Sequence, residues 1–130
     1  MRPGTSILKH FTWSTLRGDA HGETHRDADA QVFAGGNCSI QGFTPEGEDG
    51  FWSVTGDVVS AMALCDLVGD GTQQLIVGSE DFDMRVFLSD GDLLHEFSES
   101  DRVVALCNLG GRRFGYALGN GSVGTYDGPT

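Results

Sequence analysis

The sequence predicts an all-β fold in which a group of short strands recurs along the chain. Twenty of the 130 residues are glycine, well above the usual share of about 7 %. These glycines separate short apolar runs instead of clustering as in a flexible linker, which indicates brief strands joined by tight turns. An apolar content of 38 % is sufficient for the core of one domain of this length.

An internal repeat refines the fold class. The segment "ALCDL" at Ala63–Leu67 returns as "ALCNL" at Ala105–Leu109, 42 residues further along. Other pairs recur at spacings of 41 to 44 residues: Gly78 and Gly119, Phe43 and Phe87, Asp57 and Asp101. A period of about 40–45 residues containing four short strands is typical of a β-propeller blade. The sequence therefore predicts a partial propeller of roughly two and a half four-stranded antiparallel blades.

The strands can be placed from the apolar runs and the turn residues. The central blade, 59–98, should contain strands near 59–66, 74–78, 84–88 and 93–98, with Asp90-Gly91 in its last turn. The blade before it, 31–55, should supply strands near 31–34, 39–43 and 51–55, and the blade after it, 103–126, strands near 103–109, 114–118 and 122–126. Residues 1–30 are expected to be a divergent segment with an acidic loop.

The polarity of the central strands fits this arrangement. The run "VVSAMALCD", which ends at Asp66, is apolar on both faces, as a strand between neighbouring blades must be. The run "LLHEFSES" is half polar, as expected at the outer rim. The aromatic residues expected to pack between blades are Trp13, Phe51, Trp52 and Phe114.

Charge and composition exclude several classes of function. Eight Lys and Arg residues against 19 Asp and Glu residues give a net charge of −11, which repels nucleic acid and anionic lipid. No run approaches the roughly 20 apolar residues of a membrane-spanning helix, and the first ten residues lack the apolar core of a signal peptide. Three cysteines without a C-x-x-C pair suit a reducing, cytosolic compartment, and we expect Cys38, Cys65 and Cys107 to be buried small side chains.

The segment that starts at Asp66 is a candidate metal loop. Calcium loops place oxygens at alternate positions because the cation takes 6–8 oxygen ligands. Asp66 and Asp70 stand at positions one and five, and the Thr72 carbonyl stands at position seven. Val68 at position three offers no ligand, and Gln74 at position nine offers only a neutral amide. The pattern predicts a hairpin whose carboxylates cap backbone N–H groups, with no metal site, no cofactor and at most weak calcium binding.

Other candidate motifs have weaker support. His21 and His25 have a spacing that would suit zinc together with Asp19 or Asp27, but the segment has no apolar stripe to make it helical, which favours a solvated acidic loop. Arg17-Gly18-Asp19 is a three-residue match to an adhesion motif with no other extracellular feature around it. No G-x-S-x-G elbow and no glycine-rich loop before a helix is present. The sequence predicts no catalytic residues and no enzyme activity.

Longer segments resemble a known family. "GGNCSIQGF", "ALCDLVGDG", "GSEDFDMRVF" and "RFGYALGNGSVGTYD" are similar, in order and almost without gaps from Gly35 to Asp127, to the N-terminal β-propeller of the Bardet-Biedl syndrome 2 family. That family provides subunits of a ciliary coat complex called the BBSome. The family often has a fuller "D-x-D-x-D-G" in the loop at Asp66, so this sequence departs from it there.

The resemblance implies a non-enzymatic scaffold that contacts other BBSome-type subunits during trafficking of ciliary membrane proteins. It also implies a location in the cytoplasm, at the cilium, on the ciliary membrane or at the basal body. The alternative is a calcium-dependent interaction module of the integrin-like propeller type, which the incomplete loop disfavours.

The ends of an incomplete propeller should be exposed and apolar. Because a blade buries both faces against its neighbours, a fragment leaves one face uncovered at each end, and these faces are expected to support self-association. The residues expected on the two open faces are Val32, Ile40 and Trp52 at the first end, and Val104, Leu106 and Tyr116 at the second.

Overall fold

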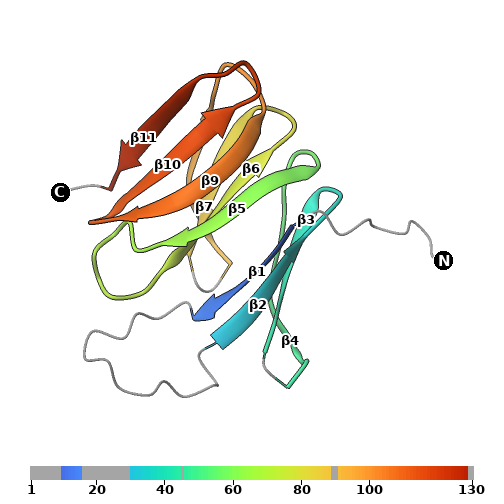
Figure 1. Cartoon of the computed structure of the whole chain (residues 1–130). Helices are drawn as coiled ribbons and strands as arrows, with labels where there is room; N and C mark the ends of the chain where they lie inside the picture. Colours follow the sequence, from blue (N-terminus) through green and yellow to red (C-terminus); the bar gives the residue numbers. More distant parts are fainter. Residues whose placement is uncertain (1–9, 16–29, 45, 89–90, 129–130) are drawn as a thin grey trace.

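The computed structural model describes residues 10–15, 30–44, 46–88 and 91–128 of the 130-residue chain. Within these residues the fold is all-β, with strands arranged in three antiparallel sheets (Figure 1). The first sheet contains β1 (His10–Thr15), β2 (Ala30–Gly35), β3 (Ser39–Phe43) and β4 (Asp49–Val54). This architecture confirms the predicted fold class.

The other two sheets repeat the same up-and-down order. The second contains β5 (Val59–Cys65), β6 (Gln74–Ser79), β7 (Asp83–Phe87) and β8 (Leu93–Ser98). The third contains β9 (Val103–Gly110), β10 (Arg113–Leu118) and β11 (Val123–Asp127), and a fourth strand is absent from it among the described residues. Every strand expected from the sequence is present, with ends that differ by at most two residues.

Strand β1 was not expected. Its register with β2 runs from His10 opposite Gly35 to Thr15 opposite Ala30, so the segment 1–30, assigned above to a divergent region outside the blades, supplies one strand of the first sheet. The pairing satisfies backbone N–H and C=O groups of β2 that would otherwise form an open edge. Backbone pairing requires no particular side chains, so the residues of β1 need not resemble the repeated segments of the other blades.

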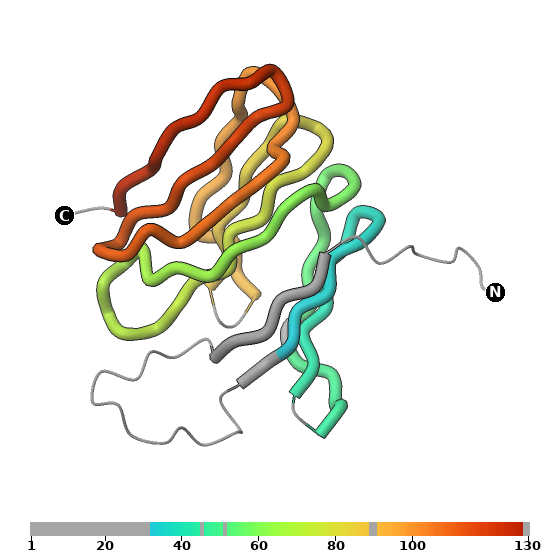
Figure 2. Tube along the Cα trace, viewed as in Figure 1, coloured from blue at the N-terminus to red at the C-terminus, as the bar shows by residue number. Residues whose placement is uncertain are grey.

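The repeated segments occupy equivalent places. Strands β5 and β9 lie at corresponding ends of their sheets and pack side by side (Figures 1 and 2). Strand β1 packs beside β5 in the same way (Figure 1). The "ALCDL" and "ALCNL" segments therefore begin in the inner strands of successive blades, as predicted.

Two apolar cores lie between the three sheets. The central sheet contributes to both because consecutive residues of a strand point to opposite faces. Leu75 and Val77 of β6 pack toward the first sheet, and Ile76 between them packs toward the third sheet. All six residues of β6 are consequently buried, whereas β8 at the rim is mostly exposed. The core residues contributed by the neighbouring sheets are Phe33 and Ile40 on one side, and Val103, Phe114 and Leu118 on the other.

A buried arginine links the outer strands of the central sheet. The Arg85 guanidinium lies 2.7 Å from a Glu96 carboxylate oxygen and 3.2 Å from Asp83, and it donates to the Ser79 hydroxyl at 3.2 Å. A buried charge requires such partners because desolvation is costly. This network accounts for the otherwise unusual arginine in a strand that is buried along most of its length.

The three cysteines are free thiols, as predicted, but only Cys65 is buried. Cys38 and Cys107 are exposed, so the expectation of three buried side chains was wrong for these two. Cys38 lies in the turn between β2 and β3 with φ of 62°, and Cys107 lies on a sheet face that none of the described residues covers. Within the described residues, no helix has the length and apolar character needed to cross a membrane.

Close approach of the sheets leads to a first prediction. A Cβ added at Gly78 would lie 2.6 Å from the Val103 Cβ of the third sheet. We expect Gly78→Ala to lower the free energy of unfolding by about 1–3 kcal/mol, because a packed core resists added volume, as measured by urea denaturation.

The matched control is Gly119, the repeat equivalent of Gly78. Its nearest neighbour is the flexible Arg102 side chain at 3.1 Å, so Gly119→Ala should change stability much less. Adding Val103→Ala to Gly78→Ala should recover part of the loss. Equal effects of the two glycine substitutions would show that sheet contact does not select glycine at position 78.

Candidate functional site: the Asp66 loop and the outer sheet faces

The loop after β5 is closed by its own carboxylates. Asp66 accepts hydrogen bonds from three backbone N–H groups, those of Gly69 at 2.8 Å, Asp70 at 3.2 Å and Gly71 at 2.8 Å. Asp70 accepts from the Thr72 N–H at 2.9 Å. Glycine at 69 and 71 permits the turn, because φ is 85° and 87° there. The predicted capping role of both carboxylates is confirmed by these bonds.

Gln74 has a role that the sequence did not reveal. Its side chain is 1 % exposed; its amide oxygen accepts from the Leu67 N–H at 2.7 Å and the Val68 N–H at 3.2 Å. Its amide nitrogen donates to the Thr72 carbonyl at 2.6 Å. The sequence pattern marks Gln74 only as a poor calcium ligand, whereas in the structure its buried amide bonds to both sides of the loop.

The candidate ligand groups of the loop are hydrogen-bonded within the chain. Both Asp66 carboxylate oxygens, one Asp70 carboxylate oxygen and the Thr72 carbonyl each accept at least one hydrogen bond. We therefore still expect calcium binding at this loop to be weak at most. No group of three or more His, Cys, Asp or Glu residues suited to a metal occurs in the described part of the chain. His21, His25, Asp19, Asp27 and the Arg17-Gly18-Asp19 motif lie outside the described residues.

These contacts give a prediction for calcium. Titration calorimetry should detect no binding tighter than the weak range of about 10⁻⁴–10⁻³ M. Gln74→Asp would add a carboxylate at position nine, but it should instead lower the free energy of unfolding by about 1–3 kcal/mol, because the N–H groups of Leu67 and Val68 lose their acceptor. Val68→Asp, at an exposed position, is the control. Micromolar calcium affinity would contradict the prediction.

The one difference between the segments "ALCDL" and "ALCNL" also has a structural reason. Asn108 stands where the previous repeat has Asp66. Its amide nitrogen donates to the Leu64 carbonyl at 2.9 Å, and its amide oxygen accepts from the Gly110 N–H at 2.6 Å. An ionised aspartate can only accept, so only the asparagine can donate this bond from β9 to β5. The sequence signal was this one change inside an otherwise matched segment.

An aromatic cluster closes the outer part of the second core. The Tyr126 ring lies 4.5 Å from Phe97, 5.4 Å from Phe114 and 5.2 Å from Tyr116 between ring centres. Its hydroxyl donates a hydrogen bond to Glu99. Burial and the Glu99 carboxylate together raise the pKa of Tyr126 well above its ordinary range. The predicted packing role of Phe114, which is 1 % exposed, is confirmed.

The raised pKa predicts a loss of stability in alkali. The folded chain holds the Tyr126 proton more tightly than the unfolded chain, so this contribution to stability is complete below about pH 10 and falls as the pH rises further. Burial also raises the pKa of the Cys65 thiol. To remove this second titrating group, Tyr126→Phe should be made in a Cys65→Ala background and compared with Cys65→Ala alone. Tyr126→Phe should then reduce the drop in unfolding free energy above about pH 10, measured by urea denaturation. Parallel pH profiles would contradict this.

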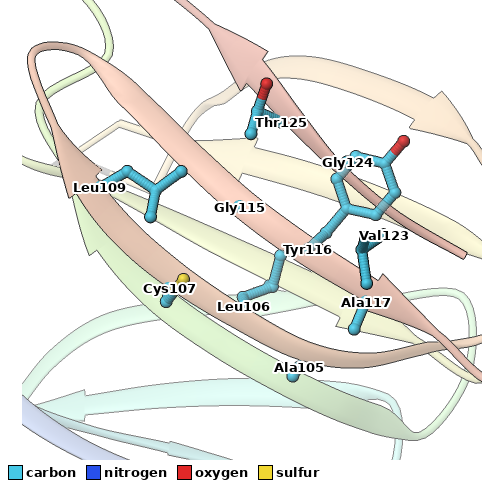
Figure 3. A pocket seen from close by; sticks show the side chains of 10 residues that line it. All are labelled: Ala105, Leu106, Cys107, Leu109, Gly115, Tyr116, Ala117, Val123, Gly124 and Thr125. Carbon is cyan, nitrogen blue, oxygen red and sulfur yellow. The ribbon is translucent and has the colours of Figure 1, made fainter.

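The outward face of the third sheet is apolar and hollow. In one row Ala105, Ala117 and Val123 are neighbours across the strands, and in the next row Cys107, Gly115 and Thr125 are. Together with Leu109 these small side chains line a depression of about 280 Å³ (Figure 3). Leu109 is 50 % exposed and Val123 is 78 % exposed. We call this surface the tail face.

The outward face of the first sheet carries larger side chains. Val32 is opposite Phe43, Gln41 is opposite Trp52, and Ser39 is opposite Val54. Trp52 is 60 % exposed and Val54 is 56 % exposed. We call this surface the head face. The side chains of Trp13 and Phe51 are outside the described residues, and Trp52 does not pack between the sheets of this chain.

The expected open faces need three corrections. Ile40 was expected on the head face, but it is fully buried in the first core, because a one-residue change in strand register moves a side chain to the other face. Leu106 and Tyr116 were expected on the tail face, but both pack against the second core. Between the pairs Val103–Leu118 and Ala105–Ala117, strand β9 has one extra residue, and this bulge reverses the alternation that follows.

The fold and these surfaces define a class of protein. Repeated antiparallel sheets with adjacent inner strands, a self-closed loop and uncovered apolar ends form a segment of a β-propeller. A model of the family described as Ciliary BBSome complex subunit 2, middle region, matches residues 61–130. The chain belongs to this family, which confirms the resemblance found in the sequence.

Curated relatives support the same assignment. The human BBSome complex member BBS2 is 58 % identical over 93 residues, which cover 72 % of this chain and 13 % of the human protein. The zebrafish protein is 57 % identical over 93 residues, again 72 % of this chain and 13 % of the relative. The Caenorhabditis elegans BBSome complex member bbs-2 is 42 % identical over 101 residues, or 77 % and 14 % of the two chains. The chain thus spans about 13 % of the length of its human and zebrafish relatives.

Solved structures with low sequence identity confirm the fold alone. The crystal structure of BBS1N in complex with ARL6DN superposes with a TM-score of 0.67 at 20 % identity, covering 76 % of this chain and 31 % of that one. The WD40 domain of Neurospora crassa Pan2 superposes with a TM-score of 0.65 at 18 % identity, covering 92 % and 32 %.

Proposed function

We propose that this chain is a scaffold module of a BBSome-like coat complex, without enzymatic activity, that contacts other subunits during trafficking of ciliary membrane proteins. The observation that carries the proposal is the 58 % identity to human BBS2 over 93 residues, a region long enough to include most of the described blades. The proposal places the chain in the cytoplasm, at the cilium and at the basal body, without direct insertion into a membrane and without a nucleic-acid partner. The charge of −11 supports the last point, because it repels phosphate.

One loop is a specific candidate for a subunit contact. Phe82, in the turn between β6 and β7, is 42 % exposed and has φ of 74°. A bulky residue rarely adopts this conformation, because its Cβ crowds the backbone. The turn is nevertheless well defined, since the Phe82 N–H donates to the Ser79 carbonyl at 3.2 Å and the Phe82 carbonyl accepts from the Glu99 N–H at 2.8 Å. An exposed aromatic side chain held in a strained conformation suits a binding role better than a folding role.

Substitution by glycine separates these two roles. Phe82→Gly should leave the free energy of unfolding unchanged or raise it, because glycine accepts φ of 74° without strain. If Phe82 contacts a subunit, the same substitution should weaken assembly. Cys38 is the matched control, since it is also exposed and has φ of 62°, and Cys38→Gly should relieve strain without affecting assembly.

The experiment is a chimera of human BBS2 that carries this chain in place of its matched segment, expressed in ciliated cells that lack BBS2. We expect the chimera to co-purify with other BBSome subunits and to reach the cilium, and the Phe82→Gly chimera to do so several-fold less. A calcium chelator should not release the chimera, whereas the calcium-dependent alternative requires that it does. A soluble, folded chimera that fails to join the complex would refute the scaffold function.

A further inference from the structure

Four hairpins in the described part of the chain close through the same turn. In each of them one backbone N–H donates to the carbonyl three residues earlier: Gly47 to Thr44, Phe82 to Ser79, Gly91 to Leu88, and Gly121 to Leu118. The donating residue has a positive φ in every case, between 74° and 94°. Glycine is expected where a left-handed residue completes a tight hairpin, and three of the four turns have it. The fourth has Phe82.

The turn therefore does not require the aromatic ring of Phe82. The Phe82 backbone makes the hydrogen bond that glycine makes in the other three turns. The ring is 42 % exposed, and neither of the two apolar cores of the described residues includes it. Exposed aromatic side chains on rigid elements are frequent at the centres of protein interfaces. Phe82 thus has the properties of a contact for another protein.

Carboxylates lie on both sides of the Phe82 turn. The Glu80 N–H donates to the Val58 carbonyl at 2.9 Å, which brings the turn beside Asp57. The Phe82 carbonyl accepts from the Glu99 N–H at 2.8 Å, which brings the turn beside the connection between β8 and β9. We define the Phe82 surface as this aromatic residue and the carboxylates next to it in the turn and in the two connections: Phe82, Asp57, Glu80, Glu99 and Asp101.

The carboxylates of the Phe82 surface are bound only to neutral donors within the described residues. Asp57 and Asp101 each accept from the backbone N–H of the next residue, at 2.7 Å and 2.8 Å. Glu99 accepts from the Tyr126 hydroxyl. Glu80 is exposed, and its side chain has no ion pair or hydrogen bond in this part of the chain. Like charges held close together repel one another, so a cation from another molecule is favoured here.

Two arginines lie in or beside the same segments. The guanidinium of Arg85 is already bound by three carboxylates of the central sheet. The guanidinium of Arg102 lies against Gly119, 3.1 Å from the place of an added Cβ. The Phe82 surface therefore keeps an excess of negative charge around an exposed aromatic ring.

We propose that the Phe82 surface binds a positively charged segment of another BBSome-type subunit. Phe82 packs among apolar side chains of that segment, and Lys or Arg side chains of the segment pair with the surrounding carboxylates. This assignment rests on the scaffold function proposed above and specifies the chemistry of the partner. The aromatic ring supplies the apolar contact, while the carboxylates select a cationic partner and speed its encounter. An acidic or phosphate-bearing partner is repelled.

The test uses the human BBS2 chimera described above, in the complex purified from ciliated cells that lack BBS2. Glu80→Lys should lower the amount of co-purified subunits by about threefold or more, because a like charge then faces the cations of the partner. Glu80→Gln should act in the same direction and less strongly. Glu46→Lys is the matched control, since Glu46 is also exposed but lies in the turn between β3 and β4, at the other end of the strands (Figure 1).

Salt separates the two parts of the contact. Raising the salt concentration from about 0.1 M to about 1 M shortens the Debye length from about 10 Å to about 3 Å. The difference in assembly between the wild-type and Glu80→Lys chimeras should therefore shrink at high salt. The difference between the wild-type and Phe82→Gly chimeras should persist, because salt does not screen an apolar contact.

A photoreactive benzoylphenylalanine in place of Phe82 identifies the partner segment in the purified complex. Irradiation should link position 82 to a segment of another subunit in which Lys and Arg outnumber Asp and Glu. Reversing one of those cations to Glu should restore assembly of the Glu80→Lys chimera, because the two changes then compensate.

Three results would refute a basic partner and leave the scaffold function intact. These are equal assembly of the wild-type, Glu80→Lys and Glu46→Lys chimeras, a Glu80→Lys defect that is the same at both salt concentrations, and a cross-link from position 82 to an acidic segment or only to the chimera itself. A folded wild-type chimera that does not join the complex would refute both proposals. Size-exclusion chromatography identifies any variant that aggregates, and Glu80→Gln then replaces Glu80→Lys in the comparison.

Discussion

The structure depends on a central sheet that is buried on both sides. Leu75 and Val77 pack against the first sheet, while Ile76, Met84 and Val86 pack against the third. Each such side chain stabilises the fold by about 1.5–3 kcal/mol when it is fully removed from water, so neither neighbouring sheet can be lost without exposing a continuous apolar surface. Close contact of the sheets explains Gly78, and the buried charge of Arg85 is tolerated because carboxylates and a hydroxyl surround it.

Polar side chains next to these cores satisfy backbone groups that would otherwise lack hydrogen-bond partners. Asp66 and Gln74 satisfy the backbone N–H groups of a tight loop. Oxygens of this loop accept hydrogen bonds from the chain itself, and these bonds hold the loop closed. Asn108 joins two neighbouring inner strands through the hydrogen bond that it donates to Leu64, and it accepts a second bond from Gly110 of its own strand.

Membership of the BBS2 family supports the proposed scaffold role. The chain spans a small part of its human relative, and its described surface exposes Phe82 in a strained conformation and two apolar sheet faces of different shape.

The sequence by itself determined the fold class, the position of ten strands and the family, because the apolar periods, the glycine turns and the repeat of "ALCDL" as "ALCNL" are local signals. It also determined the capping role of Asp66 and Asp70, since these bonds close within a few residues. Only the tertiary structure decided which side chains face outward. The pairing of β1 with β2, the bulge in β9 that turns Leu106 inward, the inward side of Tyr116, the burial of Ile40 and the role of Gln74 all depend on strand register and on contacts between sheets. Register is fixed by packing of the whole sheet, and a shift of one residue reverses every face, so no local pattern could have specified it.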